Sequence, residues 1–342
     1  MSERPRSVLV CPGIGSYGPG ALGSLPADHP AVQAAEAIRV EYGLEPLLDL
    51  DRAEALDPAR HLRPANAAAL TFMATLLDAE RAMADHRLVA IIGSSLGWFS
   101  AIATAAALPF EDAFRLVQEI ALLREQVATD PGGGGQVIYP LAGPDWLRSP
   151  DLEAAVIDVL ADAGAGERRV FESIDLGGFV VLAGDQAGVA RLVERLPAVK
   201  AGARQYPLRL ASQGPDHTPL AEAVAEAAGD RLSGLRWQRP ETTLIDGRGV
   251  RWTPWAADWT ALREYTLGAQ LTEPYRFATS LRVALREYAP DLVVLAGPGA
   301  SLGSIVGGIV VREGYRGLRS RAAFEAAQQS SQPLVLSMGR AA

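Results

Sequence analysis

The chain has 342 residues, of which 49% are hydrophobic, and its formal net charge at neutral pH is −8. A chain of this length buries enough apolar surface to fold without disulfides, and its one cysteine, Cys11, excludes an internal disulfide framework and a cysteine-based zinc cluster. The acidic balance argues against a nucleic-acid partner, whose phosphates require a strongly basic face.

The histidines and the N-terminal segment set two further expectations. His29, His61, His86 and His217 lie far apart, with no pair at the spacing of metal ligands, so we expect neither a metal nor a cofactor. Residues 1–5 are polar, and the apolar run that follows is too short for a signal peptide or a membrane span. We therefore expect a soluble cytoplasmic protein without membrane association.

The first part of the chain alternates apolar runs with amphipathic segments. Residues 7–11 are apolar and rich in valine, and they end in a turn-rich stretch, which predicts a buried strand. The apolar run at 88–92 suits a strand of a parallel sheet, because such strands are covered on both faces. Helical periodicity predicts helices at residues 31–42, 67–85, 98–107 and 110–129.

A stretch rich in proline and glycine, residues 130–135, marks a change of pattern. Beyond it the elements follow the order strand, helix, strand, strand, helix, strand, at residues 136–141, 152–163, 169–173, 179–183, 187–196 and 204–210. This order over about 70 residues is typical of a ferredoxin-like unit. We therefore expect an α/β fold in which a large domain, residues 1–130 and 205–342, is interrupted by a small insert, residues 131–204.

The remainder of the chain returns to α/β patterning. Helices are predicted at 218–232, 276–288 and 301–313, and the apolar run at 292–295 predicts another buried strand.

The sequence Gly93-x-Ser95-x-Gly97 lies between a predicted strand and a predicted helix. A serine on such a tight turn exposes its hydroxyl above the sheet edge, and the flanking glycines relieve steric strain. The N-terminus of the following helix supplies N–H groups that favour an oxyanion. The pattern predicts a nucleophilic serine; the alternative is an ordinary glycine-rich loop in which Ser95 caps the helix.

A nucleophilic serine needs a base. His217 is the only histidine in the later half of the chain and lies in a predicted loop, where catalytic groups are common. The residues alone leave two alternatives open for it, a catalytic base or a surface histidine. For His29, His61 and His86 we expect partly exposed surface positions.

Five motifs follow one another along nearly the whole chain. They are Cys11-Pro12-Gly13-Ile14-Gly15-Ser16, Ile92-Gly93-Ser94-Ser95-Leu96-Gly97 with Ala113-Phe114-Arg115-Leu116-Val117, His217-Thr218-Pro219-Leu220, Gln270-Leu271 with Pro274, and Gly297-Pro298-Gly299. In this order and spacing they resemble the motifs of malonyl-CoA:acyl-carrier-protein transacylases and of polyketide synthase acyltransferase domains. The resemblance implies an α/β-hydrolase-like core with a ferredoxin-like insert.

The resemblance also implies roles and partners. Ser95 would attack an acyl thioester, His217 would take its proton, and the backbone carbonyl of Gln270 would hold the imidazole N–H. Ile14 and Leu96 would donate backbone N–H groups to the oxyanion. The implied partners are an acyl carrier protein and an acyl-CoA or acyl-carrier thioester substrate.

Departures from the family pattern concern the acyl group. Ile120 stands where the family has an arginine that binds the free carboxylate of malonyl groups, and an aliphatic side chain makes no such pair. Arg124, one helical turn further on, is an alternative clamp. A less polar acyl pocket is expected, and its candidate substrate-binding residues are Ile120, Ser94, Trp98, Asp216 and Phe179. An amino-bearing acyl group paired with Asp175 or Asp216 is a further hypothesis.

These observations predict a discrete acyltransferase that moves a non-malonyl acyl group between thioesters through a Ser95 acyl-enzyme, in polyketide or related secondary metabolism. The alternatives are an editing acyl-carrier-protein thioesterase of the same fold and a non-catalytic carrier-binding scaffold. Docking of an acidic carrier protein requires local basic groups. The candidate docking residues lie in or beside the insert and are Arg168, Arg169, Arg191, Arg195 and Arg204. The alternative for these residues is a solvated charged surface without a binding role.

Overall fold

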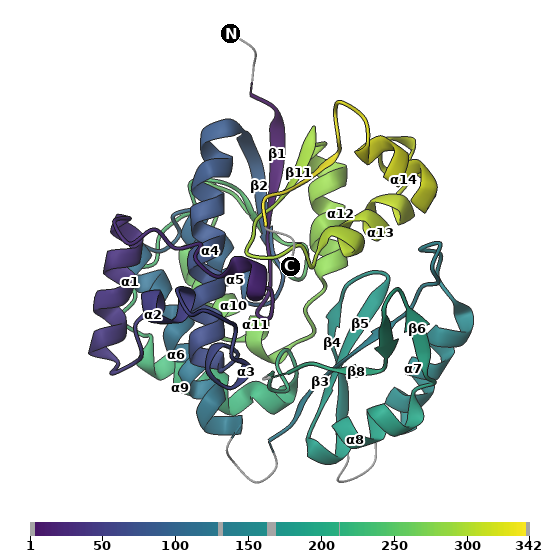
Figure 1. Cartoon of the computed structure of the whole chain (residues 1–342), viewed down its shortest axis with the longest axis horizontal. Helices are drawn as coiled ribbons and strands as arrows, with labels where there is room; N and C mark the ends of the chain where they lie inside the picture. Colours follow the sequence, from purple (N-terminus) through teal and green to yellow (C-terminus); the bar gives the residue numbers. More distant parts are fainter. Residues whose placement is uncertain (1–3, 129–132, 163–168, 212, 340–342) are drawn as a thin grey trace.

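Two β-sheets organise the computed structural model, which describes residues 4–128, 133–162, 169–211 and 213–339 (Figure 1). The larger sheet has the strand order β10-β9-β2-β1-β11-β12. Its strands are β1 (Arg6–Cys11), β2 (Arg87–Gly93), β9 (Leu244–Ile245), β10 (Arg251–Trp252), β11 (Leu292–Leu295) and β12 (Val335–Ser337). All neighbouring strands in it are parallel except β9 and β10. The predicted α/β fold with a parallel sheet is confirmed.

The central strands of this sheet are the continuous apolar runs of the sequence. In β1, Val8, Leu9 and Val10 have no exposed surface, and β2 pairs with it in a register that places Ile92 beside Val10. Both faces are covered, which is why these strands carry no polar alternation. Strands β9, β10 and β12 have only two or three residues each, too few for a recognisable sequence period.

Helices lie on both sides of the larger sheet (Figure 1). On one side α4 packs against α5 and α6, and on the other side α12 packs against α13. Alanine-rich α4 is largely buried because small side chains let the neighbouring helices approach closely. The helices of this part are α1 (Pro30–Glu41), α2 (Leu47–Asp51), α3 (Pro58–His61), α4 (Pro64–Asp85), α5 (Gly97–Thr104), α6 (Phe110–Ala128), α9 (Glu222–Arg231), α10 (Trp259–Leu267), α11 (Ala269–Thr272), α12 (Phe277–Tyr288), α13 (Gly303–Arg312) and α14 (Arg321–Gln328), with short 3₁₀ turns η1 (Pro19–Ala21), η2 (Pro219–Ala221) and η3 (Tyr315–Gly317).

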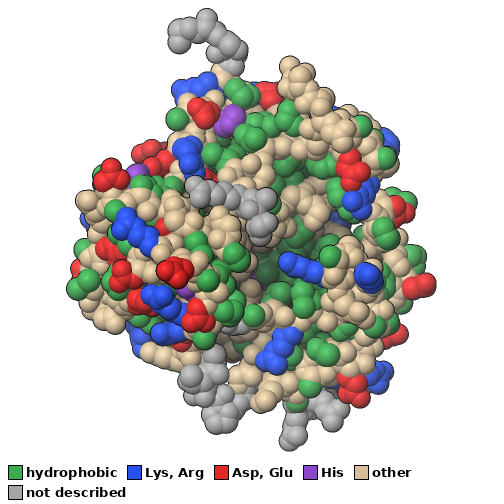
Figure 2. All heavy atoms as spheres, viewed as in Figure 1, with side chains coloured by type: hydrophobic (Ala, Val, Ile, Leu, Met, Phe, Trp, Pro, Cys, Tyr) green, Lys and Arg blue, Asp and Glu red, His purple; other side chains and the backbone are tan. Residues whose placement is uncertain are grey.

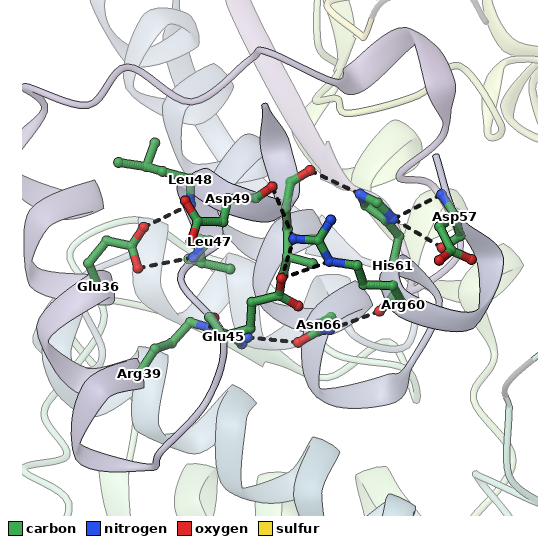
Figure 3. A network of polar contacts seen from close by, with 11 residues as sticks. Glu36, Arg39, Glu45, Leu47, Leu48, Asp49, Asp57, Arg60, His61 and Asn66 are labelled. Atoms are coloured by element: carbon green, nitrogen blue, oxygen red, sulfur yellow. Dashed lines mark hydrogen bonds and ion pairs between the residues drawn. The ribbon is translucent and has the colours of Figure 1, made fainter. Parts of the chain in front are cut away.

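A polar network connects the short N-terminal helices and corrects the expectation for one histidine (Figure 3). His61 is fully buried, accepts a hydrogen bond from the backbone N–H of Asp57 and bonds the carbonyl of Leu50 across 2.9 Å. Buried Arg39 joins the same region by donating to the carbonyl of Glu45. The surface assignment of His61 was therefore wrong, because His61 ends α3 with its ring turned inward against α2, where it bonds the Leu50 carbonyl. His29 and His86 are half-buried, as expected.

The smaller sheet is antiparallel and has the order β4-β5-β3-β8. It occupies the lower right of Figure 1, and α7 and α8 pack on it. Its core is a separate apolar cluster that includes Val137, Leu182 and Leu192. The elements are β3 (Gly135–Pro140), α7 (Pro150–Asp162), β4 (Val170–Asp175), β5 (Phe179–Gly184), α8 (Gln186–Arg195), β6 (Val199–Ala201), β7 (Arg204–Tyr206) and β8 (Leu208–Arg209).

One strand of this unit differs from expectation. The predicted strand at 204–210 is divided at Pro207: β7 pairs with β6 as a small hairpin, and only β8 joins the sheet. Proline lacks the N–H that a continuous strand would donate at this position. The order βαββαβ is the one predicted, and a ferredoxin-like insert with the bounds 131–204 stays a proposal. Within the described residues, every helix is too short or too polar to cross a lipid bilayer.

Candidate active site

Ser95 sits on the turn between β2 and α5 with a left-handed backbone, φ 54°. Such a conformation costs free energy in a residue other than glycine and persists only where the surroundings enforce it. The two flanking glycines allow it. A Cβ atom on Gly93 would lie 2.1 Å from the carbonyl carbon of Gly97, and one on Gly97 would lie 2.1 Å from the carbonyl oxygen of Cys11. Only glycine therefore fits at positions 93 and 97.

His217 lies between Ser95 and Gln270. Its Nε2 atom is 2.8 Å from Ser95 Oγ, and its Nδ1 atom is 2.6 Å from the backbone carbonyl oxygen of Gln270. A carbonyl only accepts, so Nδ1 carries the proton and the lone pair of Nε2 faces the serine hydroxyl. The backbone N–H of His217 donates to the carbonyl of Leu271 across 2.8 Å. The geometry is that of a nucleophile, a base and an acceptor that orients the base.

The protonation state of His217 suits a base. The imidazole is fully buried, and this burial lowers its pKa to about 4, against the smaller opposing influence of the Asp216 carboxylate. The Arg124 guanidinium lowers the pKa further, and the carbonyl of Gln270 raises it. The ring is therefore neutral at neutral pH, which is the form that a general base requires.

Two backbone N–H groups, those of Ile14 and Leu96, are the predicted oxyanion donors. Leu96 follows Ser95 at the N-terminus of α5, and Ile14 lies in the loop after β1. The loops are close, since a Cβ atom on Gly13 would lie 3.7 Å from the Cβ of Ser95. Among the described residues, no hydrogen-bond acceptor is paired with the N–H of Ile14 or Leu96. Neither N–H is therefore occupied by a protein acceptor, which an oxyanion donor requires.

Three supporting residues have no signal in the sequence. The carbonyl oxygen of Asp216 accepts a hydrogen bond from Ser173 Oγ at 2.8 Å and a longer one from Gln136 Nε2 at 3.4 Å. Ser173 and Gln136 belong to the smaller sheet, so this sheet holds the loop that carries His217. Tyr275 donates its hydroxyl to the carbonyl of Gly93 and lies beside the His217 ring, with ring centroids 5.4 Å apart.

The predicted substrate-binding residues do not line one common cavity. A cavity of about 900 Å³ is lined by Asp216 and Ile14. Ser94 is 5% exposed beside the nucleophile. Trp98 is fully buried and donates its indole N–H to Thr266, so it packs in the core.

Ile120 and Phe179 also lie away from the 900 Å³ cavity. Ile120 is 1% exposed in the core, and neither it nor Trp98 lines the 900 Å³ cavity. Phe179 lines a different cavity, of about 280 Å³, together with Trp146 and Tyr206. Of these candidates, only Asp216 is thus brought to the cavity that Ile14 lines.

The candidate docking arginines are spread over the smaller sheet's unit. Arg191 and Arg195 lie on α8, and Arg204 is exposed on β7. Arg169 pairs with Asp185 across 3.5 Å, and Arg168 lies outside the described residues. Figure 2 shows a hollow near the centre of the viewed face, with hydrophobic side chains inside it and Lys and Arg side chains near its edge.

A metal centre has no ligand set in the part of the chain that the structure describes. No group of three or more His, Cys, Asp or Glu side chains there is placed to hold a metal ion.

Sequence comparison finds relatives over most of the chain, although no protein-family model matches it. The malonyl CoA-acyl carrier protein transacylase of Haemophilus influenzae is 28% identical over 309 residues, which are 88% of this chain and 91% of that protein. The polyketide synthase GfsA of Streptomyces halstedii is 28% identical over 306 residues, which are 85% of this chain and 4% of that much longer protein.

Solved structures share the fold. An acyl carrier protein S-malonyltransferase from Vibrio cholerae superposes with a TM-score of 0.72 at 20% identity, covering 98% of this chain and 97% of that one. The malonyl-transacylase PlMCAT, solved in complex with the type II polyketide synthase carrier protein AntF, has a TM-score of 0.71 at 22% identity and covers 90% of this chain and 93% of that one. The homologues and structural neighbours of this chain are thus malonyl-CoA:acyl-carrier-protein transacylases and polyketide synthase acyltransferases, as the sequence motifs indicated.

Proposed function

We propose that this chain is an acyltransferase that forms an acyl ester on Ser95 and passes the acyl group to the thiol of an acyl carrier protein. The observation that carries the proposal is the aligned set Ser95 Oγ, His217 and the carbonyl of Gln270, with spacings of 2.8 and 2.6 Å. The names of the relatives, which are transacylases acting between CoA and carrier protein, support acyl transfer of this kind.

In the first half-reaction, Ser95 Oγ attacks the thioester carbonyl carbon while His217 Nε2 takes the hydroxyl proton. The carbonyl oxygen becomes an oxyanion that accepts hydrogen bonds from the N–H groups of Ile14 and Leu96. The carbon–sulfur bond then breaks, and the imidazolium returns its proton to the leaving thiolate. Ser95 is left as an ester.

In the second half-reaction the thiol of the carrier protein's phosphopantetheine arm attacks the ester carbon. His217 takes the thiol proton and gives it to Ser95 Oγ as the ester bond breaks, which restores the free enzyme. Burial of Ser95 and His217, at 8% and 0% exposed, limits the access of water to the ester. Because little water reaches the ester, transfer of the acyl group to the thiol is favoured over its hydrolysis.

We propose that the acyl group is not malonyl. Ile120 stands where the resembled family has a carboxylate-binding arginine, and its aliphatic side chain, packed in the apolar core, makes no pair with a carboxylate. The same proposal places the enzyme in the cytoplasm, in polyketide or related secondary metabolism. It also includes docking of the carrier protein at Arg191, Arg195 and Arg204.

The test offers the protein a panel of neutral and acidic acyl-CoA thioesters and reads its intact mass. We expect a covalent acyl adduct from neutral thioesters in the wild type and none in Ser95→Ala. Addition of phosphopantetheinylated carrier protein should move the adduct to the carrier. Strong labelling of the wild type by malonyl-CoA would contradict the argument from Ile120. Release of free acid in place of transfer would indicate an editing thioesterase.

A further inference from the structure

A buried ion pair faces the cavity beside His217 and takes no part in the acyl-transfer steps. Arg124 lies on α6, Asp216 directly precedes His217, and both line the cavity of about 900 Å³ that Ile14 also lines. Arg124 Nε is 2.7 Å from Asp216 Oδ1, and the two side chains are 7% and 9% exposed. Both residues also line a small adjoining cavity. Ser95 and His217 do not line the larger cavity, but Ile14, the proposed oxyanion donor, does, and this supports the larger cavity as the place of the acyl chain and the pair as part of its wall.

The guanidinium of Arg124 keeps unused hydrogen-bond donors. Its Nε and Nη2 atoms are buried, and neither makes a well-aligned hydrogen bond with any described residue, although Nε is within ion-pair distance of Asp216. A guanidinium carries five N–H donors and suits bidentate binding of a carboxylate. Asp216 thus neutralises the charge of Arg124, but it leaves the buried Nε–H and Nη2–H groups without a well-aligned hydrogen-bond acceptor.

The other charges on this wall leave the Arg124 site neutral. Arg63 and Glu125 pair with each other at 2.9 Å, and Arg209 is exposed to solvent, which weakens its field. A buried charge is tolerated when it is paired, and a third charge beside a neutral pair is left uncompensated. The carboxylate of an acidic acyl group would have to displace Asp216 or lie beside it as a second negative charge, which like-charge repulsion opposes.

We propose that Asp216 is a specificity-determining residue, whose carboxylate occupies Arg124 and so makes the acyl cavity reject acyl groups that carry a free carboxylate. This inference rests on the proposed function, since it concerns which thioester acylates Ser95. Loss of the Asp216 charge leaves a buried guanidinium with free donors. The acidic acyl group, excluded before, then becomes its best partner.

The test compares initial acylation rates with malonyl-CoA and butyryl-CoA, read as intact mass. Asp216→Asn is expected to raise the malonyl-to-butyryl ratio by about tenfold or more, because one charge-assisted contact is gained. The double variant Asp216→Asn/Arg124→Met should return the ratio to that of the wild type. Glu125→Gln is the matched control, because it removes an equal charge from the same wall without touching Arg124, and its ratio should stay that of the wild type.

A ratio that stays unchanged in Asp216→Asn, or that rises equally in Glu125→Gln, would overturn the proposal. Asp216→Ser is a second variant, since it leaves room for water beside the guanidinium; failure of both variants to fold, seen by circular dichroism, would also overturn it by showing that the pair is purely structural.

A binding measurement separates this inference from the proposed function. In a Ser95→Ala background, calorimetry compares the affinities for malonyl-CoA and butyryl-CoA with and without Asp216→Asn. If no thioester acylates the wild type, the proposed function fails. A rise in the malonyl-to-butyryl affinity ratio on Asp216→Asn would still support the role of Asp216, and an unchanged ratio would refute it.

Discussion

Ser173→Ala tests whether the smaller sheet positions His217, the proposed base. Ser173 is fully buried and donates to the carbonyl oxygen of Asp216 at 2.8 Å, next to His217 in the chain. In the variant that oxygen keeps only the bond from Gln136, whose length is 3.4 Å. Gln136 Nε2 also loses its 2.8 Å bond to Ser173 Oγ, and leaving buried polar groups poorly paired costs about 1–3 kcal/mol.

The backbone of His217 has little freedom to absorb this loss without moving, because it already lies in a left-handed conformation with φ 59°. If the loop moves and the Ser95–His217 alignment is lost, the activation free energy rises, and each ~1.4 kcal/mol of this rise lowers kcat about tenfold. We expect kcat to fall roughly 10- to 100-fold. KM should stay unchanged, because Ser173 does not line the 900 Å³ cavity proposed for the acyl chain.

The assay measures steady-state acyl transfer well below the melting temperature, beside urea denaturation. Ser280→Ala is the matched control: Ser280 is also fully buried and donates to a backbone carbonyl, that of Asp246, at 2.6 Å. Both variants should lose similar free energy of unfolding, and only Ser173→Ala should lose kcat. Equal stability loss with full activity in Ser173→Ala would refute the positioning role.

Other predictions concern the serine turn and the acidity of the site. Gly97→Ala should unfold the protein or lower its melting temperature strongly, because the added Cβ would lie 2.1 Å from the carbonyl oxygen of Cys11; a stable, active variant would contradict this packing. Gly229→Ala, in α9 with nothing within 4 Å of the added atom, should instead raise the free energy of unfolding by about 0.5–1 kcal/mol, as measured by urea denaturation. The rate of Ser95 acylation should fall as the pH drops through about 4, where buried His217 becomes protonated, and a pH–rate profile with its acidic limb near 6.5, the ordinary pKa of histidine, would refute the account of its burial.

Local patterns in the sequence were sufficient to predict the elements around the nucleophile. Strands β1 and β2 are continuous apolar runs, and the spacing of Gly93 and Gly97 around Ser95 indicated the strained turn before any contact was known. The partner of Ser95 was a different problem. His217 is 122 positions away in the chain, so periodicity and spacing left its role open, and only the family resemblance connected it with Gln270.

Contacts between distant segments account for what the sequence did not predict. Ser173 supports His217 from another sheet, and the Arg124–Asp216 pair joins a helix to a loop. No local pattern marks either one. Trp98 was predicted to contact the acyl group, but it lies in the core. Helix α5 is buried on nearly all sides, and the indole N–H of Trp98 donates to Thr266.

The most direct test of the central claim is a two-step intact-mass measurement on the wild type and on Ser95→Ala. Each protein is first treated with a neutral acyl-CoA and freed of excess reagent, and the phosphopantetheinylated carrier protein is then added. The account predicts that the wild type gains the mass of one acyl group and loses it to the carrier, whereas Ser95→Ala gains none. An adduct of equal yield in Ser95→Ala, or a wild-type adduct that never reaches the carrier, would contradict it.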